Sequence, residues 1–210
     1  MIELALPLTS TGTTALGALS LIQHRRLHAA RHDPLTGLAA RRLWMSRAER
    51  ATRRPQGLVL LIVDGDGLKQ INDQFGHEAG DVLLIAIARC LHAWAGRRGM
   101  AGRLGGDEFA VFVRLAADEP LTDRLDALRA GLSAPVLHHA DMLRAGASIG
   151  AVVVDTLTVP TLSQAMRAAD AAMYQAKQGG DGAWIVADGR GQPVPAAIAP
   201  VSDSGRKVRG

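Results

Sequence analysis

The stretch Arg103-Leu104-Gly105-Gly106-Asp107-Glu108-Phe109 separates two short apolar segments, at about 100–104 and 109–115, in the middle of the chain. Glycine readily adopts the positive backbone φ angles that tight turns require, and adjacent glycines between strand-like segments are typical of a β-hairpin. We therefore predict two antiparallel strands whose connecting turn carries Asp107 and Glu108.

A second apolar run, from Leu58 to Val63, has the composition of a buried strand and ends at Asp64-Gly65-Asp66-Gly67. Around it the hydrophobic periodicity alternates between helix and strand. We expect helices over 39–53, 79–95, 119–131 and 161–177, and further strands near 134–138, 145–154 and 183–187. This order predicts an α/β fold, in the broad sense that includes α+β, with a central sheet of about five strands flanked by helices.

The chain of 210 residues divides into three predicted regions. Residues 1–31 form an apolar N-terminal segment and a helix that leads into the domain. Residues 32–187 form the folded domain itself. Residues 188–210 are rich in proline and glycine, have no hydrophobic periodicity, and are predicted to be a disordered tail.

Residues 4–23 carry no charge and are followed by Arg25 and Arg26. A span of about 20 apolar residues can cross a bilayer, and flanking arginines then lie on the cytoplasmic side. Pro7 and the Ser and Thr residues between positions 9 and 14 argue against a spanning helix. We expect a cytoplasmic protein and leave open an anchor to the inner face of the cell membrane through residues 1–23. A helix in this region could also pair with a copy of itself.

The composition of the chain argues against some classes of function. The formal net charge is +4, but the basic residues form no dense run and aromatic residues make up only 3% of the chain, which argues against a nucleic-acid-binding protein. The single cysteine, Cys90, excludes an intrachain disulfide and fits a reducing cytoplasm.

Two carboxylates are candidates for metal binding. Asp64 ends the buried strand and Asp107 lies in the hairpin turn that we expect beside it; carboxylates at strand ends suit Mg²⁺, which prefers hard oxygen ligands. Asp66 shares a face with Asp64 if the strand continues, so either or both could reach a metal. The backbone N–H groups around Gly65 and Gly67 could cradle phosphate, with Lys69 adding charge. Taken singly, each aspartate also fits an ordinary turn.

Five segments together resemble the GGDEF family of diguanylate cyclases. Besides Arg103–Phe109, they are Asp33-Pro34-Leu35-Thr36-Gly37-Leu38; Lys69-Gln70-Ile71-Asn72-Asp73-Gln74-Phe75-Gly76-His77 with Gly80-Asp81; Ser148-Ile149-Gly150; and Ala169-Asp170 with Met173-Tyr174-Gln175-Ala176-Lys177. They occur in the family's order and spacing. The resemblance implies a fold like the palm of nucleotide cyclases and polymerases.

The resemblance also implies an activity, the condensation of two GTP into cyclic di-GMP through 3′,5′-phosphodiester bonds. Asp64, Asp107 and the carbonyl of Gly65 would hold two metal ions, Mg²⁺ or Mn²⁺, at each GTP site. Glu108 would lie near the metals or the attacking hydroxyl and is a candidate general base. Asp64, Asp107 and Glu108 are therefore the expected catalytic residues of a nucleotidyltransferase in second-messenger signalling of bacterial type.

The same resemblance assigns the substrate contacts. Asn72 and Asp81 would read guanine, since a carboxylate accepts hydrogen bonds from the N1–H and exocyclic amine that adenine lacks as a pair. The triphosphate would be held by Gly67, Leu68, Lys69 and Lys177. Each subunit would hold one GTP, so activity implies a C₂ homodimer.

Three positions depart from the family pattern. An Arg-x-x-Asp product-inhibition site is missing, because Gly96 and Gly99 stand at its two ends, so we expect no feedback inhibition there. Asp181 stands where a phosphate-binding cation is expected, and Gly67-Leu68 replaces a bulkier pair. The Asp181 departure favours an alternative, a catalytically inactive GGDEF module that binds GTP or a protein partner in signalling. A cyclase or polymerase-like enzyme with a different product is a third reading, and Asn72 and Asp81 argue against an adenine substrate.

Overall fold

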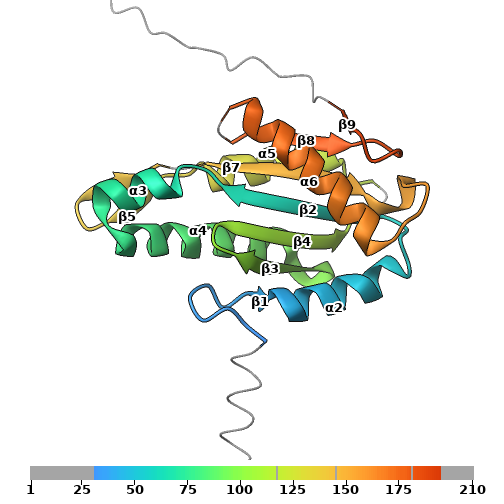
Figure 1. The fold of residues 1–210 in the computed structure, drawn as a ribbon, viewed down its shortest axis with the longest axis horizontal. Coiled ribbons are helices and arrows are strands. Elements are labelled where there is room, and N and C mark those ends of the chain that lie inside the picture. The colour runs from blue at the N-terminus through green and yellow to red at the C-terminus, as the bar shows by residue number, and fades with distance from the viewer. Residues whose placement is uncertain (1–30, 117, 145, 181, 195–210) are drawn as a thin grey trace, which may run out of the picture.

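The computed structural model describes residues 31–116, 118–144, 146–180 and 182–194, in which a mixed seven-stranded sheet is flanked by helices on both faces (Figure 1). The sheet has the order β1-β3-β4-β2-β7-β8-β9. Its strands are β1 (Ala39–Ala40), β2 (Leu58–Gly65), β3 (Gly99–Gly105), β4 (Glu108–Arg114), β7 (Ala147–Val153), β8 (Trp184–Ala187) and β9 (Pro193–Val194). The helices are α2 (Arg41–Thr52), α3 (Leu68–Phe75), α4 (His77–Ala95), α5 (Leu121–Leu132) and α6 (Leu162–Gln178), with short 3₁₀ turns at Gly96–Arg98 and Val154–Thr156.

The predicted fold class is confirmed. Five of the six predicted strand segments correspond to β3, β4, β2, β7 and β8, and the two-residue strands β1 and β9 extend the sheet at its edges. The predicted strand near 134–138 belongs instead to a separate hairpin, β5 (Val136–His138) and β6 (Asp141–Leu143). Strands of two or three residues are too short to leave a periodic signal in the sequence.

The chain departs from the predicted tail boundary at residue 188. Residues 188–194 turn back, and β9 pairs antiparallel with β8. The turn is closed by Asp188, whose carboxylate accepts hydrogen bonds from the backbone N–H groups of Arg190 and Gln192. A proline in an edge strand needs no ladder partner for its missing N–H, so Pro193 does not prevent this pairing. The rest of the predicted tail, 195–210, and the segment 1–30 lie outside the described residues.

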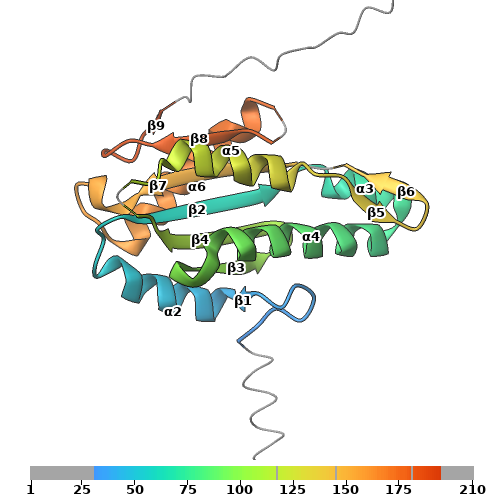
Figure 2. The same cartoon turned by 180° about the vertical axis from the view of Figure 1, so that it is seen from behind.

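Strand β2 is buried on both faces along its whole length. Leu58, Leu60 and Ile62 belong to the core cluster that packs against α2 and α6. Val59, Leu61 and Val63 belong to the opposite cluster, which packs against α4 and α5 (Figures 1 and 2). Because side chains alternate along a strand, the next residue on the α6 side of β2 is Asp64.

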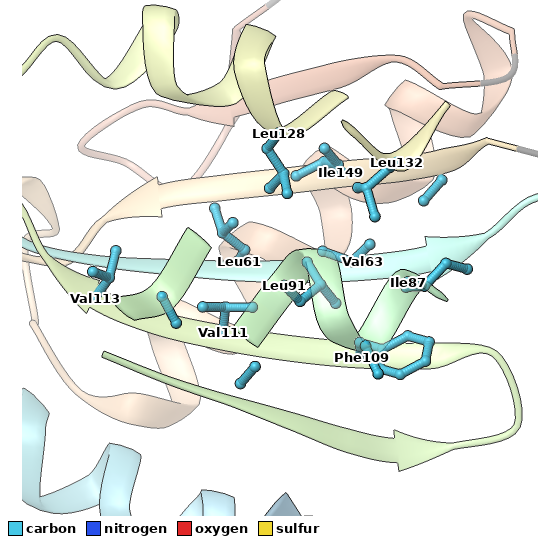
Figure 3. Packing of buried hydrophobic residues seen from close by; sticks show 14 of the residues in the cluster. Leu61, Val63, Ile87, Leu91, Phe109, Val111, Val113, Leu128, Leu132 and Ile149 are labelled. Carbon is cyan, nitrogen blue, oxygen red and sulfur yellow. The ribbon is translucent and has the colours of Figure 1, made fainter. Parts of the chain in front are cut away.

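The core between the sheet and helices α4 and α5 is made of aliphatic side chains and one phenyl ring (Figure 3). Phe109 follows the hairpin turn directly and is completely buried there. Phe109 directly follows Glu108, so its burial fixes the end of the hairpin turn against the core.

Helix α4 and the 3₁₀ turn after it (His77–Arg98) are long and apolar enough to cross a membrane by length and composition. In the fold, Leu83, Ile87 and Leu91 on this helix are buried. Cys90 is half-buried and packs against the same core, and its burial raises the pKa of the thiol. The hydrophobicity of α4 is therefore accounted for by packing against the sheet.

Strand register sets the position of the polar residues at the end of β2. Strand β2 runs antiparallel to both β4 and β7, and Asp64 is aligned with Glu108 on one side and Ser148 on the other. The hairpin turn between β3 and β4 therefore lies beside the last residues of β2, as the sequence predicts.

Gly150 allows helix α6 to approach the sheet closely. A Cβ atom at Gly150 would lie 1.9 Å from the carbonyl oxygen of Ala169 and 2.2 Å from the backbone nitrogen of Met173. Both atoms belong to the backbone of α6, so the clash could not be relieved by turning a side chain. The last turn of α6 carries Lys177, and the position of that residue depends on this contact.

We expect Gly150→Ala to lower the free energy of unfolding by about 2 to 4 kcal/mol, because the helix must move away from the sheet. Urea denaturation of the two proteins measures the difference. Gly179→Ala is the matched control, since the nearest atom to a Cβ there is 3.3 Å away and the backbone is already helical; it should change stability by less than about 0.5 kcal/mol. Equal effects of the two substitutions would contradict the close approach.

Candidate functional site

The end of β2 and the hairpin turn form one corner of the molecule. The backbone N–H of Gly65 donates to the carbonyl oxygen of Asp107 at 3.0 Å. A methyl group on Gly65 would lie 3.4 Å from Cβ of Asp107, so the two residues are in contact distance of one another. Asp64 is buried, Asp107 is half-buried and Glu108 is exposed. The residues predicted to hold metal, Asp64, Gly65 and Asp107, are thus neighbours in space, with Glu108 beside them.

Lys177 reaches this corner from the last turn of α6. Its Nζ atom lies 2.5 Å from Oδ1 of Asp64, and the two groups form an ion pair. The hydrogen bond to Asp64 raises the pKa of Lys177, the charges of Asp64, Asp66 and Asp107 add to this, and partial burial opposes it. The ammonium is therefore held in the combined field of three carboxylates.

Asp66 has a different environment from Asp64. Its carboxylate is buried and accepts hydrogen bonds from Oγ of Ser148, at 3.0 and 3.1 Å to its two oxygens, and from the backbone N–H of Gly182 at 3.1 Å. The sequence left open whether Asp64, Asp66 or both could reach a metal. Because Asp66 joins β2 to β7 and to the loop after α6, its oxygens are engaged in holding these segments together.

The donor set at this corner fits a hard divalent cation. Within the described part of the chain, no three His, Cys, Asp or Glu side chains form a group that could hold a metal ion alone. Asp64, Asp107 and the Gly65 carbonyl would supply oxygen ligands only. Mg²⁺ is commonly bound by one or two carboxylates, with waters and substrate phosphates completing an octahedron. Such a centre would be completed by a nucleotide rather than by more protein ligands.

The loop after β2 leads directly into helix α3. Gly67 precedes the helix with φ of 73°, a left-handed conformation that favours glycine. Leu68 is partly buried against the core, while Lys69 is exposed in the first turn. N–H groups in the first turn of a helix lack intrahelical acceptors, so Gly67, Leu68 and Lys69 could offer theirs to phosphate.

The two predicted guanine contacts meet where α3 and α4 join. Asn72 lies in the last turns of α3, and Asp81 lies exposed near the start of α4. The Oδ1 atom of Asn72 packs against Gly80, where an added Cβ would lie only 2.0 Å away. This oxygen is buried and has no hydrogen-bond partner in the part of the chain that the structure describes. A buried amide with an unsatisfied atom is uncommon in a native fold and needs an explanation.

A second hydrogen-bond network, centred on Arg103, holds the hairpin turn in place. Arg103 donates to the carbonyl of Gly106 through Nε at 2.9 Å and Nη2 at 2.7 Å, and its Nη1 lies 3.1 Å from Oδ1 of Asp33. Asp33 also accepts from the backbone and hydroxyl of Thr36. Although burial favours its protonated form, these hydrogen bonds from Thr36 and then Arg103 lower the pKa of Asp33 on balance. Asp33 and Arg103 therefore link the hairpin turn to the start of the domain and support the fold.

The sequence did not predict two of these contacts, the Lys177–Asp64 ion pair and the Asp66–Ser148 hydrogen bonds. Their partners are 113 and 82 positions apart, and no local pattern indicates such pairs. Asp181, which departs from the family pattern, lies outside the described residues. Gly96 begins the 3₁₀ turn after α4 and Gly99 begins β3, so both lie at the opposite end of β3 from the hairpin turn.

Comparison with known proteins gives a consistent result. Residues 30–183 match the family described as "Diguanylate cyclase, GGDEF domain". The chain is 46% identical over 172 residues to an uncharacterized 19.3 kDa protein of Streptomyces ambofaciens, covering 80% of this chain and 92% of that protein. It is 37% identical over 156 residues to the diguanylate cyclase DgcN of Escherichia coli, covering 72% of this chain but 38% of DgcN.

Among solved structures, the GGDEF domain of TpbB (YfiN) from Pseudomonas aeruginosa superposes with a TM-score of 0.69 at 32% sequence identity. The alignment covers 76% of this chain and 96% of that domain. The chain therefore spans nearly the whole of an isolated GGDEF domain, but well under half of a larger relative such as DgcN.

The lowered pKa of Asp33 predicts how its contribution to stability depends on pH. A carboxylate whose pKa is depressed in the folded state stabilises the fold above its ordinary pKa of 3.8, and this stabilisation is lost as the pH falls through the lower folded value. We expect Asp33→Asn to lower the free energy of unfolding by about 1 to 2 kcal/mol at pH 7, as for other hydrogen bonds to charged groups. The difference should shrink below pH 3.8.

Urea denaturation of both proteins from pH 7 to pH 3 tests this. Asp141→Asn, at an exposed position on β6, controls for the loss of one negative charge. A difference between wild type and Asp33→Asn that stays constant over the whole range would contradict the assigned role.

Proposed function

Because this chain belongs to the GGDEF family of diguanylate cyclase domains, we propose that it condenses two GTP into cyclic di-GMP. The observation that carries the proposal is the contact between Gly65 and Asp107, which brings the carboxylates of Asp64 and Asp107 to one corner beside an intact Gly-Gly-Asp-Glu-Phe turn. Each new bond would form between a 3′-oxygen and an α-phosphorus. The bond from that phosphorus to the β-phosphate bridging oxygen would break, and pyrophosphate would leave.

We propose that Asp64, Asp107 and the carbonyl of Gly65 bind Mg²⁺ or Mn²⁺, two ions at each GTP site. When bound, two such ions neutralise the phosphates and stabilise the attacking and leaving oxygens of an in-line displacement. The burial of Asp64 supports its role, because an anchored carboxylate needs little reorganisation to bind a cation. The hydrogen bond from Gly65 to Asp107 supports the alignment of the donors.

Glu108 is the proposed group nearest to the attacking 3′-hydroxyl. It is exposed and is aligned with Asp64 across β4 and β2, on the same side of the sheet. A carboxylate in that position could accept the hydroxyl proton as a general base. Its exposure also suits a hydroxyl that arrives from outside this subunit.

The guanine base would be read by Asn72 and Asp81, and the triphosphate by Gly67, Leu68, Lys69 and Lys177. The buried Oδ1 of Asn72 has no hydrogen-bond partner among the described residues, and such an unsatisfied atom supports a functional rather than a structural role for this amide. The exposure of Asp81 leaves its carboxylate available to the N1–H and amine of guanine. These contacts favour GTP over ATP.

We further propose that the active form is a homodimer. One subunit with one nucleotide site supplies either the hydroxyl or the α-phosphate, so two copies must face each other about a two-fold axis. The region 1–31 is a candidate for bringing the subunits together, and an attachment to the inner face of the cell membrane through 1–23 remains a hypothesis about that region.

A second candidate function is a GGDEF module that binds GTP or a protein partner without turnover. Asp181 favours it, because a negative charge stands where the family has a phosphate-binding cation. The two functions differ in one measurable property, the formation of cyclic di-GMP.

Incubation of the purified full chain with GTP and Mg²⁺ or Mn²⁺, resolved by chromatography and mass spectrometry, should yield cyclic di-GMP and pyrophosphate. Loss of several kcal/mol of metal-assisted stabilisation in Asp107→Ala predicts a fall in rate of at least about 100-fold. Chelation of the metal should abolish turnover. Asp123→Asn, at an exposed position on α5, is the control and should retain the wild-type rate. Folded wild type that binds GTP but forms no product would support the non-catalytic module.

The replacement of both ends of the Arg-x-x-Asp motif by Gly96 and Gly99 predicts that turnover does not stop as product accumulates. Initial rates measured with increasing added cyclic di-GMP should decline only through competition at the GTP site, which excess GTP relieves. High-affinity inhibition of the wild type that GTP does not relieve would contradict this prediction.

A further inference from the structure

Lys177 differs from Asp64 in how freely it can move. The side chain of Asp64 is only 12% exposed, whereas that of Lys177 is 50% exposed, although the two are 2.5 Å apart. The carboxylate is fixed at the end of a fully buried strand. The ammonium is carried on a flexible four-carbon chain at the end of α6, and it could leave Asp64 without any repacking of the core.

The ammonium occupies a place that a metal would need. Of the two carboxylates proposed as metal ligands, Asp64 is the more buried, and removing a carboxylate from water is costly unless a cation is near. In the described residues, the cation that forms an ion pair with Asp64 is Lys177. The charges of Asp66 and Asp107 hold the ammonium at the same corner. A divalent cation that binds Asp64 must therefore compete with this ammonium.

We propose that Lys177 is a tethered counter-ion that blocks Asp64 to free divalent metal and is drawn away by the triphosphate, so that metal and nucleotide bind cooperatively. This rests on the proposed function, because it takes Asp64 as a metal ligand and Lys177 as a phosphate contact. It adds a role for Lys177 before the substrate is bound, and it makes the metal–nucleotide complex, rather than the free metal, the species that the site accepts.

Thermodynamic linkage makes the proposal quantitative. If nucleotide raises the affinity for metal by some factor, metal raises the affinity for nucleotide by the same factor. In the wild type, the nucleotide relieves the competition at Asp64 by offering the ammonium another anion. In a protein without the Lys177 ammonium, no side-chain cation of the described residues competes with the metal at Asp64. Nucleotide binding then raises the affinity for metal by a smaller factor. Removal of the Lys177 charge should therefore strengthen metal binding alone and weaken the coupling.

The test measures Mn²⁺ binding to the full chain by the electron paramagnetic resonance signal of free Mn²⁺, first without nucleotide and then with guanosine 5′-(α,β-methylene)triphosphate, which cannot react. We expect Lys177→Met to raise the nucleotide-free affinity for Mn²⁺ about tenfold, within the range of ordinary coupling between sites. The increase on adding the analogue should be smaller in Lys177→Met than in wild type. Lys177→Arg keeps a cation and should retain weak nucleotide-free binding.

Two controls separate competition at Asp64 from a general effect of charge. Arg50→Met removes one positive charge from an exposed position in the last turn of α2, just before the start of β2 and thus at the opposite end of that strand from Asp64, and should change the nucleotide-free affinity for Mn²⁺ less than twofold. Adding Asp64→Asn to Lys177→Met should remove the gain. Circular dichroism checks that each variant is folded; Lys177→Gln serves as a second uncharged variant.

The proposal is overturned if Lys177→Met and Lys177→Gln bind Mn²⁺ without nucleotide no better than wild type, or if Arg50→Met gives an equal gain. Neither measurement requires catalysis. A chain that forms no cyclic di-GMP but gains Mn²⁺ affinity in Lys177→Met would refute the proposed activity and support the role of Lys177. A chain that forms cyclic di-GMP without that gain would do the reverse.

Discussion

The fold depends on the complete burial of β2. This strand lies between β4 and β7, and its side chains enter the core on both faces of the sheet. A one-residue shift in its register would exchange the two sets of side chains and place Asp64 on the α4 side, away from Lys177. The same burial that stabilises the strand therefore fixes where its last carboxylate lies. The arrangement of charged groups at the end of β2 therefore depends on how the middle of the strand packs in the core.

Asp64 and Asp66 are separated by one residue but have different environments. Asp66 accepts hydrogen bonds from Ser148 and Gly182 and ties three segments together. Asp64 faces one mobile cation, Lys177. A buried carboxylate whose hydrogen bonds tie separate segments together is a structural group, whereas one paired with a half-exposed ammonium can change partners. The difference supports Asp64 as the carboxylate available to a ligand.

Separate contacts hold the hairpin turn and the end of α6 in place. The hairpin turn rests on buried Phe109 and on the Arg103–Asp33 network, which reaches back to the start of the domain. The end of α6 rests on β7 through Gly150, where no side chain separates helix from strand. These supports are rigid, while the groups that they carry, Glu108 and Lys177, are exposed. This combination of a fixed frame with exposed charged groups supports the proposal that metal and nucleotide bind together at this site.

Local patterns in the sequence predicted much of the fold and several of the candidate site residues. The apolar run of β2, the glycine pair of the hairpin and the periodicity of α4 and α6 predicted the sheet and its helices. The strand ends indicated Asp64 and Asp107, and the resemblance to the GGDEF family implied roles for Asn72 and Asp81. The short strands β1, β6 and β9 escaped prediction, because two or three residues carry no periodicity. The choice between Asp64 and Asp66 and the partner of Lys177 depended on residues brought together from distant parts of the chain. Hydrogen bonds and ion pairs between such residues are set by the packing of the sheet and α6, which no local pattern of sequence encodes.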